Sequence, residues 1–222
     1  MSAEGLRLYS YWRSSAAYRV RIALNLKELT YETVAIHLTE NGGAQHGADY
    51  QELNPQEMVP TLRDGGRIVR QSMAIIEYLH ETYESGARLL PATARDRARV
   101  RALAQLIACD VHPLNNLRVM QYLEREFNAP QVEREHWTRH WIVEGFKAFE
   151  ALLRENPATG EFCEGDGPSL ADICLIPQVY NAQRWGVDMT PYPVISRINE
   201  TCLALPAFEQ AQPENQPDAP KA

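Results

Sequence analysis

Two adjacent serines, Ser14 and Ser15, occupy a place in the sequence where their side chains could hold an anion or a thiolate. They lie between the apolar/polar alternation of residues 6–9, which predicts a short strand, and an apolar set at helical spacing in residues 20–26. The first backbone N–H groups of a helix lack intrahelical partners, and the helix dipole favours negative charge there. The pattern therefore indicates an anion or thiolate site, with a simple helix N-cap as the alternative.

The other reactive side chains form no metal or redox motif. His136 and His140 are four residues apart and could share a helix face, but no third ligand is near them, and the adjacent tryptophans indicate ordinary packing. The cysteines form no C-x-x-C pair and no cysteine–histidine spacing that suggests zinc. We therefore expect no metal site, and reduced, mainly structural thiols at Cys109, Cys163, Cys174 and Cys202.

Length, composition and charge bound the function. The 222 residues could form one large domain or two small ones, and 45% of them are hydrophobic, which is enough for a core. The formal net charge of −7 argues against nucleic acid or an anionic membrane as the main partner. No apolar run is long enough to span a bilayer, and residues 1–5 lack the basic-then-apolar order of a signal peptide. We expect a cytoplasmic protein.

The elements around the two serines mix strand and helix patterns. Pro60 fits the start of a strand, because proline cannot donate to a strand ladder, and Asp64-Gly65-Gly66 is a hairpin turn signal. The order of elements in this first third resembles a thioredoxin fold. The predicted elements are a strand at 6–9, a helix to Lys27, a strand at 31–36, a loop at 40–47, a short helix at 48–53, strands at 61–63 and 67–70, and a helix opened by Gln71-Ser72.

Strand patterns vanish after Pro91. Ser169 followed by Asp172 predicts a capping box, with Asp in place of the usual Glu. The C-terminal residues are polar and rich in proline, which indicates disorder. The sequence thus predicts an α/β domain at 1–87, an all-helical domain at 92–211 with helices at 95–126 (kinked at Pro113), 131–154, from Ser169 onward and 194–203, and a disordered tail at 212–222.

An α/β third followed by an all-helical remainder is the plan of the cytosolic glutathione transferases, and five stretches resemble the zeta class of that family. Two features depart from the family pattern: Ala16 stands where the serine motif usually has cysteine, and His112 stands where glutamine is frequent. A reactive cysteine therefore cannot belong to the chemistry here. The five stretches are the serine motif at 11–24, the cis-proline turn at Val59-Pro60, the Gln71-Ser72 pair, the helix stretch at 112–117, and its C-terminal counterpart at 184–193.

The resemblance implies an α/β thioredoxin-like N-terminal domain, an all-α C-terminal domain, glutathione as cofactor and a homodimer. It implies a glutathione-dependent isomerase that converts maleylacetoacetate to fumarylacetoacetate in tyrosine and phenylalanine breakdown. A thiolate that adds to the cis double bond makes it a single bond, rotation becomes easy, and expulsion of the thiolate leaves the trans isomer. The alternatives are a maleylpyruvate isomerase, a broader transferase acting on α-haloacids, and a non-catalytic transferase-like binding module.

The resemblance also assigns roles to individual residues. Ser14 is the principal donor to the thiolate and Ser15 the backup, while Arg13 and Arg184 match positions that could clamp the carboxylates of a diacid substrate. His112 and Asn116 either hold glutathione or donate to the charge that develops on the substrate carbonyl oxygen. The positions expected to bind glutathione are Gln45 for the glycyl end, Val59 and Pro60 for the cysteinyl part, and Gln71 and Ser72 for the γ-glutamyl carboxylate.

The hydrogen bond from one serine hydroxyl is strong enough to lower the pKa of the glutathione thiol below neutral pH. A free thiol has a pKa of about 8.5. Lowering it by about two units requires roughly 2.7 kcal/mol. A hydrogen bond to a charged sulfur supplies roughly 1.5–3 kcal/mol, and a helix N-terminus adds roughly 0.3–1 kcal/mol. Ser14 at a strand–helix junction therefore requires no general base beside it.

Overall fold

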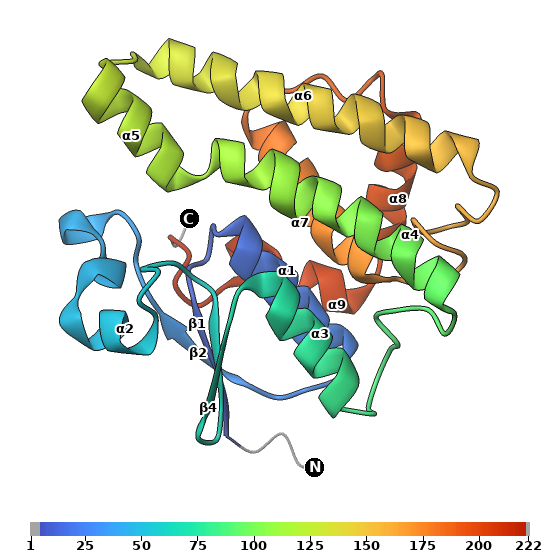
Figure 1. Ribbon diagram of the computed structural model, residues 1–222, viewed down its shortest axis with the longest axis horizontal. Coiled ribbons are helices and arrows are strands. Elements are labelled where there is room, and N and C mark those ends of the chain that lie inside the picture. The colour runs from blue at the N-terminus through green and yellow to red at the C-terminus, as the bar shows by residue number, and fades with distance from the viewer. Residues whose placement is uncertain (1–4, 221–222) are drawn as a thin grey trace. The chain divides into compact units, whose positions relative to one another are not determined.

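The computed structural model describes residues 5–220, which separate into two compact units (Figure 1). The first unit contains the described residues up to Leu89 together with those from Ala204 onward, and the second is Leu90–Leu203. The division between Leu89 and Leu90 falls in the short segment between the two predicted domains. The residues at the very ends of the predicted domain and tail, 1–4 and 221–222, lie outside the described part.

The first unit is built on a four-stranded sheet with the order β2-β1-β3-β4. β1 runs parallel to β2 and antiparallel to β3, with Leu8 opposite both Thr33 and Leu62. α1 and α3 pack against each other, and α2 lies on the other side of the strands (Figure 1). The predicted thioredoxin-like order is confirmed. Its elements are β1 (Leu6–Ser10), α1 (Ser15–Leu26), β2 (Glu32–Ala35), α2 (Ala48–Leu53), β3 (Thr61–Asp64), β4 (Arg67–Arg70) and α3 (Ser72–Thr82).

The core of the first unit forms where α1 meets the sheet and α3. Leu8 and Leu62 from the strands and Ile22 from α1 are completely buried. Each such side chain contributes about 1.5–3 kcal/mol on burial. The hairpin between β3 and β4 turns at Gly65, whose φ of +55° favours glycine. The sheet and its hairpin thus form as the alternation and the Asp-Gly-Gly turn predict.

The second unit contains only helices and turns within its described residues. α7 is its centre, because twelve of its residues are buried. The predicted capping box is confirmed: the Ala171 N–H donates to Ser169 Oγ (3.2 Å), and the Ser169 N–H donates to Asp172 Oδ2 (2.8 Å). The helices are α4 (Ala94–Gln105), α5 (Leu117–Phe127), α6 (Gln131–Glu155), α7 (Leu170–Arg184) and α8 (Pro193–Leu203).

The long helix predicted over residues 95–126 is broken rather than kinked. A π-helical turn, Leu106–Val111, and a 3₁₀ turn, His112–Asn115, separate α4 from α5. Pro113 has no N–H with which to continue an α-helix, and Asn116 has extended backbone (φ −72°, ψ 149°). A new helix therefore begins after Asn116, whose side chain accepts from the Arg118 N–H (3.2 Å).

The prediction of a disordered tail is wrong, and so is the end of the predicted helical domain. The chain after Leu203 joins the first unit and contains α9 (Pro206–Glu209) and a 3₁₀ turn, Pro213–Asn215. Phe208 and Ala211 are completely buried. Within the predicted tail itself, Pro213 is buried and Asp218 Oδ2 accepts a hydrogen bond from the Trp12 N–H (2.9 Å), and polar composition does not reveal either contact. No helix within residues 5–220 is both long and apolar enough to cross a membrane.

Candidate functional site

Ser14 is the N-cap of α1, as one of the two interpretations of the sequence required. Its Oγ accepts a hydrogen bond from the Ala17 N–H (3.2 Å), and its own N–H donates to the Tyr11 carbonyl (3.0 Å), closing a tight turn. A hydroxyl has one hydrogen and two acceptor lone pairs, so accepting from Ala17 leaves the O–H able to donate. Ser15 is the first residue of α1, and both serines are half-buried. Capping and thiolate donation are therefore compatible at Ser14.

Arg13 lies in the same turn. Its guanidinium carbon is 5.3 Å from the centroid of the Trp12 ring, and the side chain is half-buried. A guanidinium over an aromatic face keeps its planar donors free at the edges. Arg13 thus places a cation next to Ser14 in the sequence and on the same turn.

Val59 packs in one apolar cluster with Tyr11, the first residue of the Ser14 turn. The Val59–Pro60 peptide bond is cis, as expected. Val59 is 8% exposed and belongs to an apolar cluster with Tyr11, Ile36 and Tyr50. Tyr11 opens the Ser14 turn, so one cluster connects the turn to the segment that is expected to pair with a peptide ligand.

The residue before Val59 is held by two side chains. Asn54 Nδ2 and the Tyr50 hydroxyl both donate to the Met58 carbonyl, at 2.7 and 2.8 Å. Asn54 also donates to Thr61 Oγ1 (3.3 Å) on the far side of the turn. The backbone around Val59 is thus fixed by partly or fully buried side-chain hydrogen bonds rather than by a strand partner.

Gln71 and Ser72 open α3 with a strained residue. Gln71 has φ +71° and ψ 121°, a region that costs a non-glycine residue about 1–3 kcal/mol. Its Nε2 donates to Gln56 Oε1 (2.7 Å), while Ser72 is buried and its Oγ accepts from Arg19 Nη1 (3.4 Å). Strain of this kind is concentrated at ligand-binding positions, which supports a binding role for this helix start.

Gln45 is buried inside its own loop. Its Nε2 donates to the Leu38 carbonyl (3.2 Å) and lies 3.0 Å from His46 Nε2. Gln45 Oε1 is buried without a partner among the described residues. A buried acceptor without a partner costs about 1–3 kcal/mol, so the conformation of this loop is destabilised by that amount.

The second unit holds the remaining three candidates. His112 opens the 3₁₀ turn and Asn116 ends it as the N-cap of α5. Between them, Asn115 Oδ1 accepts from Asn181 Nδ2 (3.3 Å), so the turn is attached to α7. Asn181 and Asn115 carry no motif in the sequence that predicts this contact.

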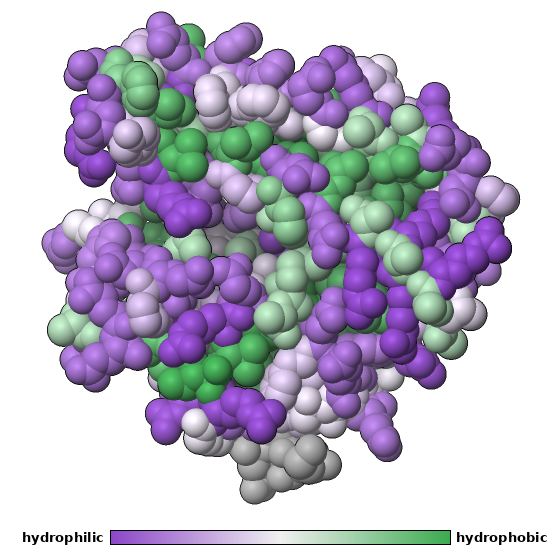
Figure 2. Space-filling model, viewed as in Figure 1, coloured by the Kyte–Doolittle hydropathy of each residue, from purple (hydrophilic) through white to green (hydrophobic). Residues whose placement is uncertain are grey.

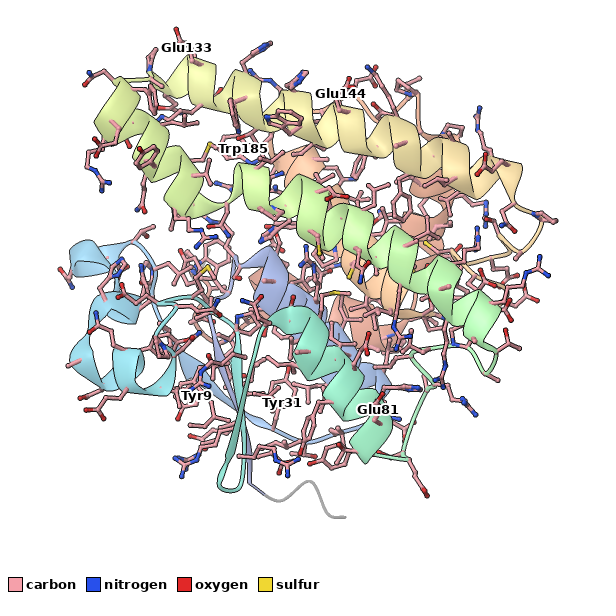
Figure 3. All side chains as sticks on the ribbon, viewed as in Figure 1. Tyr9, Tyr31, Glu81, Glu133, Glu144 and Trp185 are labelled. Atoms are coloured by element: carbon pink, nitrogen blue, oxygen red, sulfur yellow. The ribbon has the colours of Figure 1, made fainter. Side chains whose placement is uncertain are left out.

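Arg184 is joined to the same network. It is the last residue of α7, and its guanidinium carbon is 4.7 Å from the ring centroid of Trp185, which Figure 3 labels. Trp185 Nε1 donates to Asn181 Oδ1 (3.1 Å). Asn181 therefore links the turn that carries Asn116 to the ring on which Arg184 stacks.

The structure brings the candidates together in two groups, one in each unit. Within the first unit, Ser14 is connected to Val59 through the Tyr11 cluster, and α1 is connected to Ser72 through Arg19. Within the second unit, Asn181 connects the 112–116 turn to Trp185, beside Arg184. A cavity of about 680 Å³ between α2 and the sheet, lined by Tyr9 (labelled in Figure 3) among others, contains none of the candidates.

Two buried arginines of α1 were missed as functional residues. Arg19 and Arg21 are 2% and 0% exposed, and burial lowers the pKa of Arg21 to about 10. The signal was present in the sequence, because charged residues inside an all-apolar helical run are buried only when they are paired. Arg21 donates to the Trp12 carbonyl (3.0 Å), two residues before Ser14.

No cysteine lies in the serine motif, where Ala16 follows Ser15. Cys163, Cys174 and Cys202 are buried, and burial raises the pKa of the Cys163 and Cys202 thiols. His140 packs against Trp141, with 4.9 Å between the ring centroids. Within the part of the chain that is described, no group of three or more His, Cys, Asp or Glu side chains could hold a metal ion.

Comparison of the sequence with known proteins points to one family. Residues 8–88 match the family model described as "Glutathione S-transferase, N-terminal domain". The whole chain is similar to a probable maleylacetoacetate isomerase of Vibrio cholerae, with 54% identity over 214 residues that cover 96% of this chain and 98% of that protein.

Two solved structures superpose on nearly the whole chain. One is the holo structure of a maleylpyruvate isomerase described as a bacterial glutathione S-transferase of the zeta class, with a TM-score of 0.93, 46% identity, and 96% of this chain and 100% of that chain covered. The other is a maleylacetoacetate isomerase from Methylobacterium extorquens AM1 with bound malonate and GSH, with a TM-score of 0.93, 44% identity, and 97% and 100% covered.

Proposed function

The chain belongs to the zeta class of the glutathione transferases, and on this premise we propose that it is a glutathione-dependent isomerase that converts maleylacetoacetate to fumarylacetoacetate. The observation that carries the proposal is the Ser14 turn, where a hydroxyl free to donate stands at the N-terminus of α1. The relatives that support this substrate include the protein of Vibrio cholerae, at 54% identity.

The residues of the first unit fit glutathione. Val59 offers backbone in a fixed conformation for the cysteinyl part, with Pro60 after it, and Gln71 and Ser72 offer the start of α3 for a carboxylate. Gln45 has a buried acceptor without a described partner that suits a peptide N–H. When bound, glutathione supplies a thiolate whose reversible addition to the cis double bond permits rotation about it.

The task of Ser14 and Ser15 is to favour the ionised thiol. The Ser14 hydroxyl donates to the sulfur, and the first N–H groups of α1 and the helix dipole add to this. The expected stabilisation is roughly 1.5–3 kcal/mol from the hydroxyl. Because Ala16 removes the motif's usual cysteine, the serines and the helix end perform this task without a second thiol.

The arginines are assigned to the diacid. Arg13 and Arg184 are stacked on neighbouring tryptophans and can bind carboxylates through two parallel N–H groups. A relative of the same class binds the dicarboxylate malonate together with GSH. His112 and Asn116 donate to the substrate oxygen on which charge develops, or hold glutathione. We further propose that the enzyme is a cytoplasmic homodimer.

Maleylpyruvate isomerase is a second candidate, favoured by the 46% identity to an enzyme of that name. The deciding experiment is steady-state isomerisation of both substrates, with and without glutathione. We expect turnover only with glutathione and a higher kcat/KM for maleylacetoacetate. A large preference for maleylpyruvate would show that maleylpyruvate is the substrate. If neither compound is turned over and bound glutathione shows no thiolate absorbance, the chain is a non-catalytic binding module.

A further inference from the structure

The segment after Leu203 contacts the backbone from which the Ser14 turn starts. Arg21 is the connection: its Nε donates to the Ala211 carbonyl (3.0 Å) and its Nη2 to the Trp12 carbonyl (3.0 Å). Its Nη1 lies 3.4 Å from the Tyr11 carbonyl and 3.3 Å from Ser10 Oγ, acting as donor to both. One buried guanidinium therefore joins the C-terminal segment to the last residues before Ser14.

Asp218 holds the same peptide from the other side. The Trp12 N–H donates to Asp218 Oδ2 (2.9 Å), across 206 positions of sequence. Trp12 thus has its N–H bound by the C-terminal segment and its carbonyl bound by Arg21. Both backbone groups at the centre of the turn that ends at Ser14 are satisfied by charged side chains, which form the stronger class of hydrogen bond.

The segment after Leu203 is itself folded and is attached to α1, so it can hold Asp218 in place against the Trp12 backbone. Asn25 of α1 donates to the Ala207 carbonyl (2.9 Å), and Phe208 and Ala211 are completely buried. Gln216 Nε2 donates to the carbonyls of Gln210 and Gln212, at 2.9 and 2.8 Å, which closes the path towards Asp218.

We propose that Asp218, with the C-terminal segment that carries it, is a positioning residue for Ser14, acting through the backbone of Trp12. The proposal rests on the proposed function of Ser14 as donor to the glutathione thiolate. Asp218 fixes the turn 11–14, and Arg21 fixes it from the opposite side, so that the Ser14 hydroxyl keeps one direction. A hydroxyl that points in several directions would stabilise a thiolate less, because a hydrogen bond weakens steeply as it departs from linearity.

Asp218 can change the pKa of the bound thiol in two ways, through its charge and through the position that it gives the Ser14 turn. The two ways shift that pKa in opposite directions, so an experiment can distinguish them. The charged and titratable groups around Arg21 are Asp218, Glu214, Tyr18 and Tyr31, and Arg13 lies in the turn itself, over the Trp12 ring. Removing the negative charge of Asp218 would by itself lower the pKa of a nearby bound thiol, since a like charge disfavours the thiolate. Loosening the turn would raise it.

The experiment compares Asp218→Ala with Asp218→Asn in the full-length chain. Asn keeps an acceptor for the Trp12 N–H and removes the charge, whereas Ala removes both. We expect Asp218→Ala to raise the pKa of bound glutathione, followed by thiolate absorbance, to lower kcat/KM at neutral pH with recovery at alkaline pH, and to speed hydrogen exchange of the Trp12 amide by about tenfold. Asp218→Asn keeps the acceptor and loses only the charge, so it should return the Trp12 exchange rate and kcat/KM to wild-type levels and give a thiol pKa at or below the wild-type value.

Tyr83→Phe is the matched control. Like Asp218→Ala, this substitution removes one hydrogen bond to an aspartate in the first unit. The lost bond is the one that the Tyr83 hydroxyl donates to Asp64 Oδ2 (2.6 Å). It should lower stability and leave the bound thiol's pKa unchanged. A thiol pKa that is lowered or unchanged in Asp218→Ala would overturn the proposal. Wild-type enzyme that forms no thiolate with glutathione would instead contradict the proposed function, while the exchange at Trp12 still reports on the contact.

Discussion

Two of the helix starts that carry proposed site residues have a side-chain cap, Ser14 at α1 and Asn116 at α5. Each cap accepts a backbone N–H of the following turn through its side chain. Nine of the twelve residues of α1 are buried, whereas α5 has no buried residue among its eleven. Two aromatic side chains of α5, Tyr122 and Phe127, are 51% and 67% exposed.

Because of this difference in burial, we call the start of α1 the rigid start and the start of α5 the adaptable start. The Ser14 turn is fixed by Arg21, Asp218 and the Tyr11 cluster. The turn before α5 is attached to α7 through Asn181 and Asn115 and to α6 through Trp137, whose Nε1 donates to the Leu114 carbonyl (2.7 Å), but α5 itself buries no residue. Figure 2 shows hydrophobic side chains among hydrophilic ones along the long helices of the second unit. A fixed turn keeps the hydroxyl of the proposed donor Ser14 in one direction, whereas α5 has no buried residue to hold it in the same way.

The largest effect is expected at the rigid start. Ser14→Ala should raise the pKa of bound glutathione by more than one unit and lower kcat/KM near neutral pH by about 10- to 100-fold, because it removes a hydrogen bond to a charged atom. The pH dependence of kcat/KM measures both. Ser15→Ala is the matched variant, with a smaller expected loss. Unchanged turnover in Ser14→Ala would remove Ser14 from the mechanism.

Arg184→Ala should act on the substrate instead of the thiol. We expect KM for the diacid to rise about tenfold, with little change in glutathione affinity, because the lost contact is to a carboxylate. Initial rates at varied substrate and glutathione separate the two constants. Arg125→Ala removes an exposed arginine that pairs with Glu126 and should change neither. Equal losses for substrate and glutathione would count against the clamp.

Asn116→Ala tests the adaptable start directly. It should remove about 1 kcal/mol of cap energy, and because α5 buries no residue, the loss should stay local. Hydrogen exchange should quicken in the first turn of α5 while the Tm of the protein changes little. A large fall in Tm would show that α5 is coupled to the core, and the contrast with α1 would fail.

The smallest effect concerns alkaline pH. The Tyr78 and Tyr83 hydroxyls both donate to Asp64 Oδ2 (2.7 and 2.6 Å), and burial, followed by this bond, raises the pKa of both above the usual 10. A raised folded-state pKa contributes stability that is complete below pH about 10 and is lost as pH rises further. Urea unfolding from about pH 8 upward should show this decline, and Tyr83→Phe should flatten it.

Local patterns were sufficient for most elements. The alternation at β1, the Asp-Gly-Gly turn after β3 and the Ser169–Asp172 capping box depend on residues within a few positions of each other, so each was predictable. The break between α4 and α5 was only partly predictable. Pro113 marked its place, but whether a helix kinks or stops there depends on the hydrogen bonds that the turn finds, such as Asn181 to Asn115.

The sequence by itself determined the position of Ser14 at a helix start, the absence of cysteine at Ala16, and the family to which these residues belong. Only the tertiary structure decided that a segment composed like a disordered tail holds the turn before Ser14. The reason is physical: the Trp12–Asp218 hydrogen bond joins residues 206 positions apart, and the partners of Arg21 are mostly carbonyl oxygens, which every residue carries. Composition cannot distinguish such acceptors, and the fold alone brings them to one guanidinium.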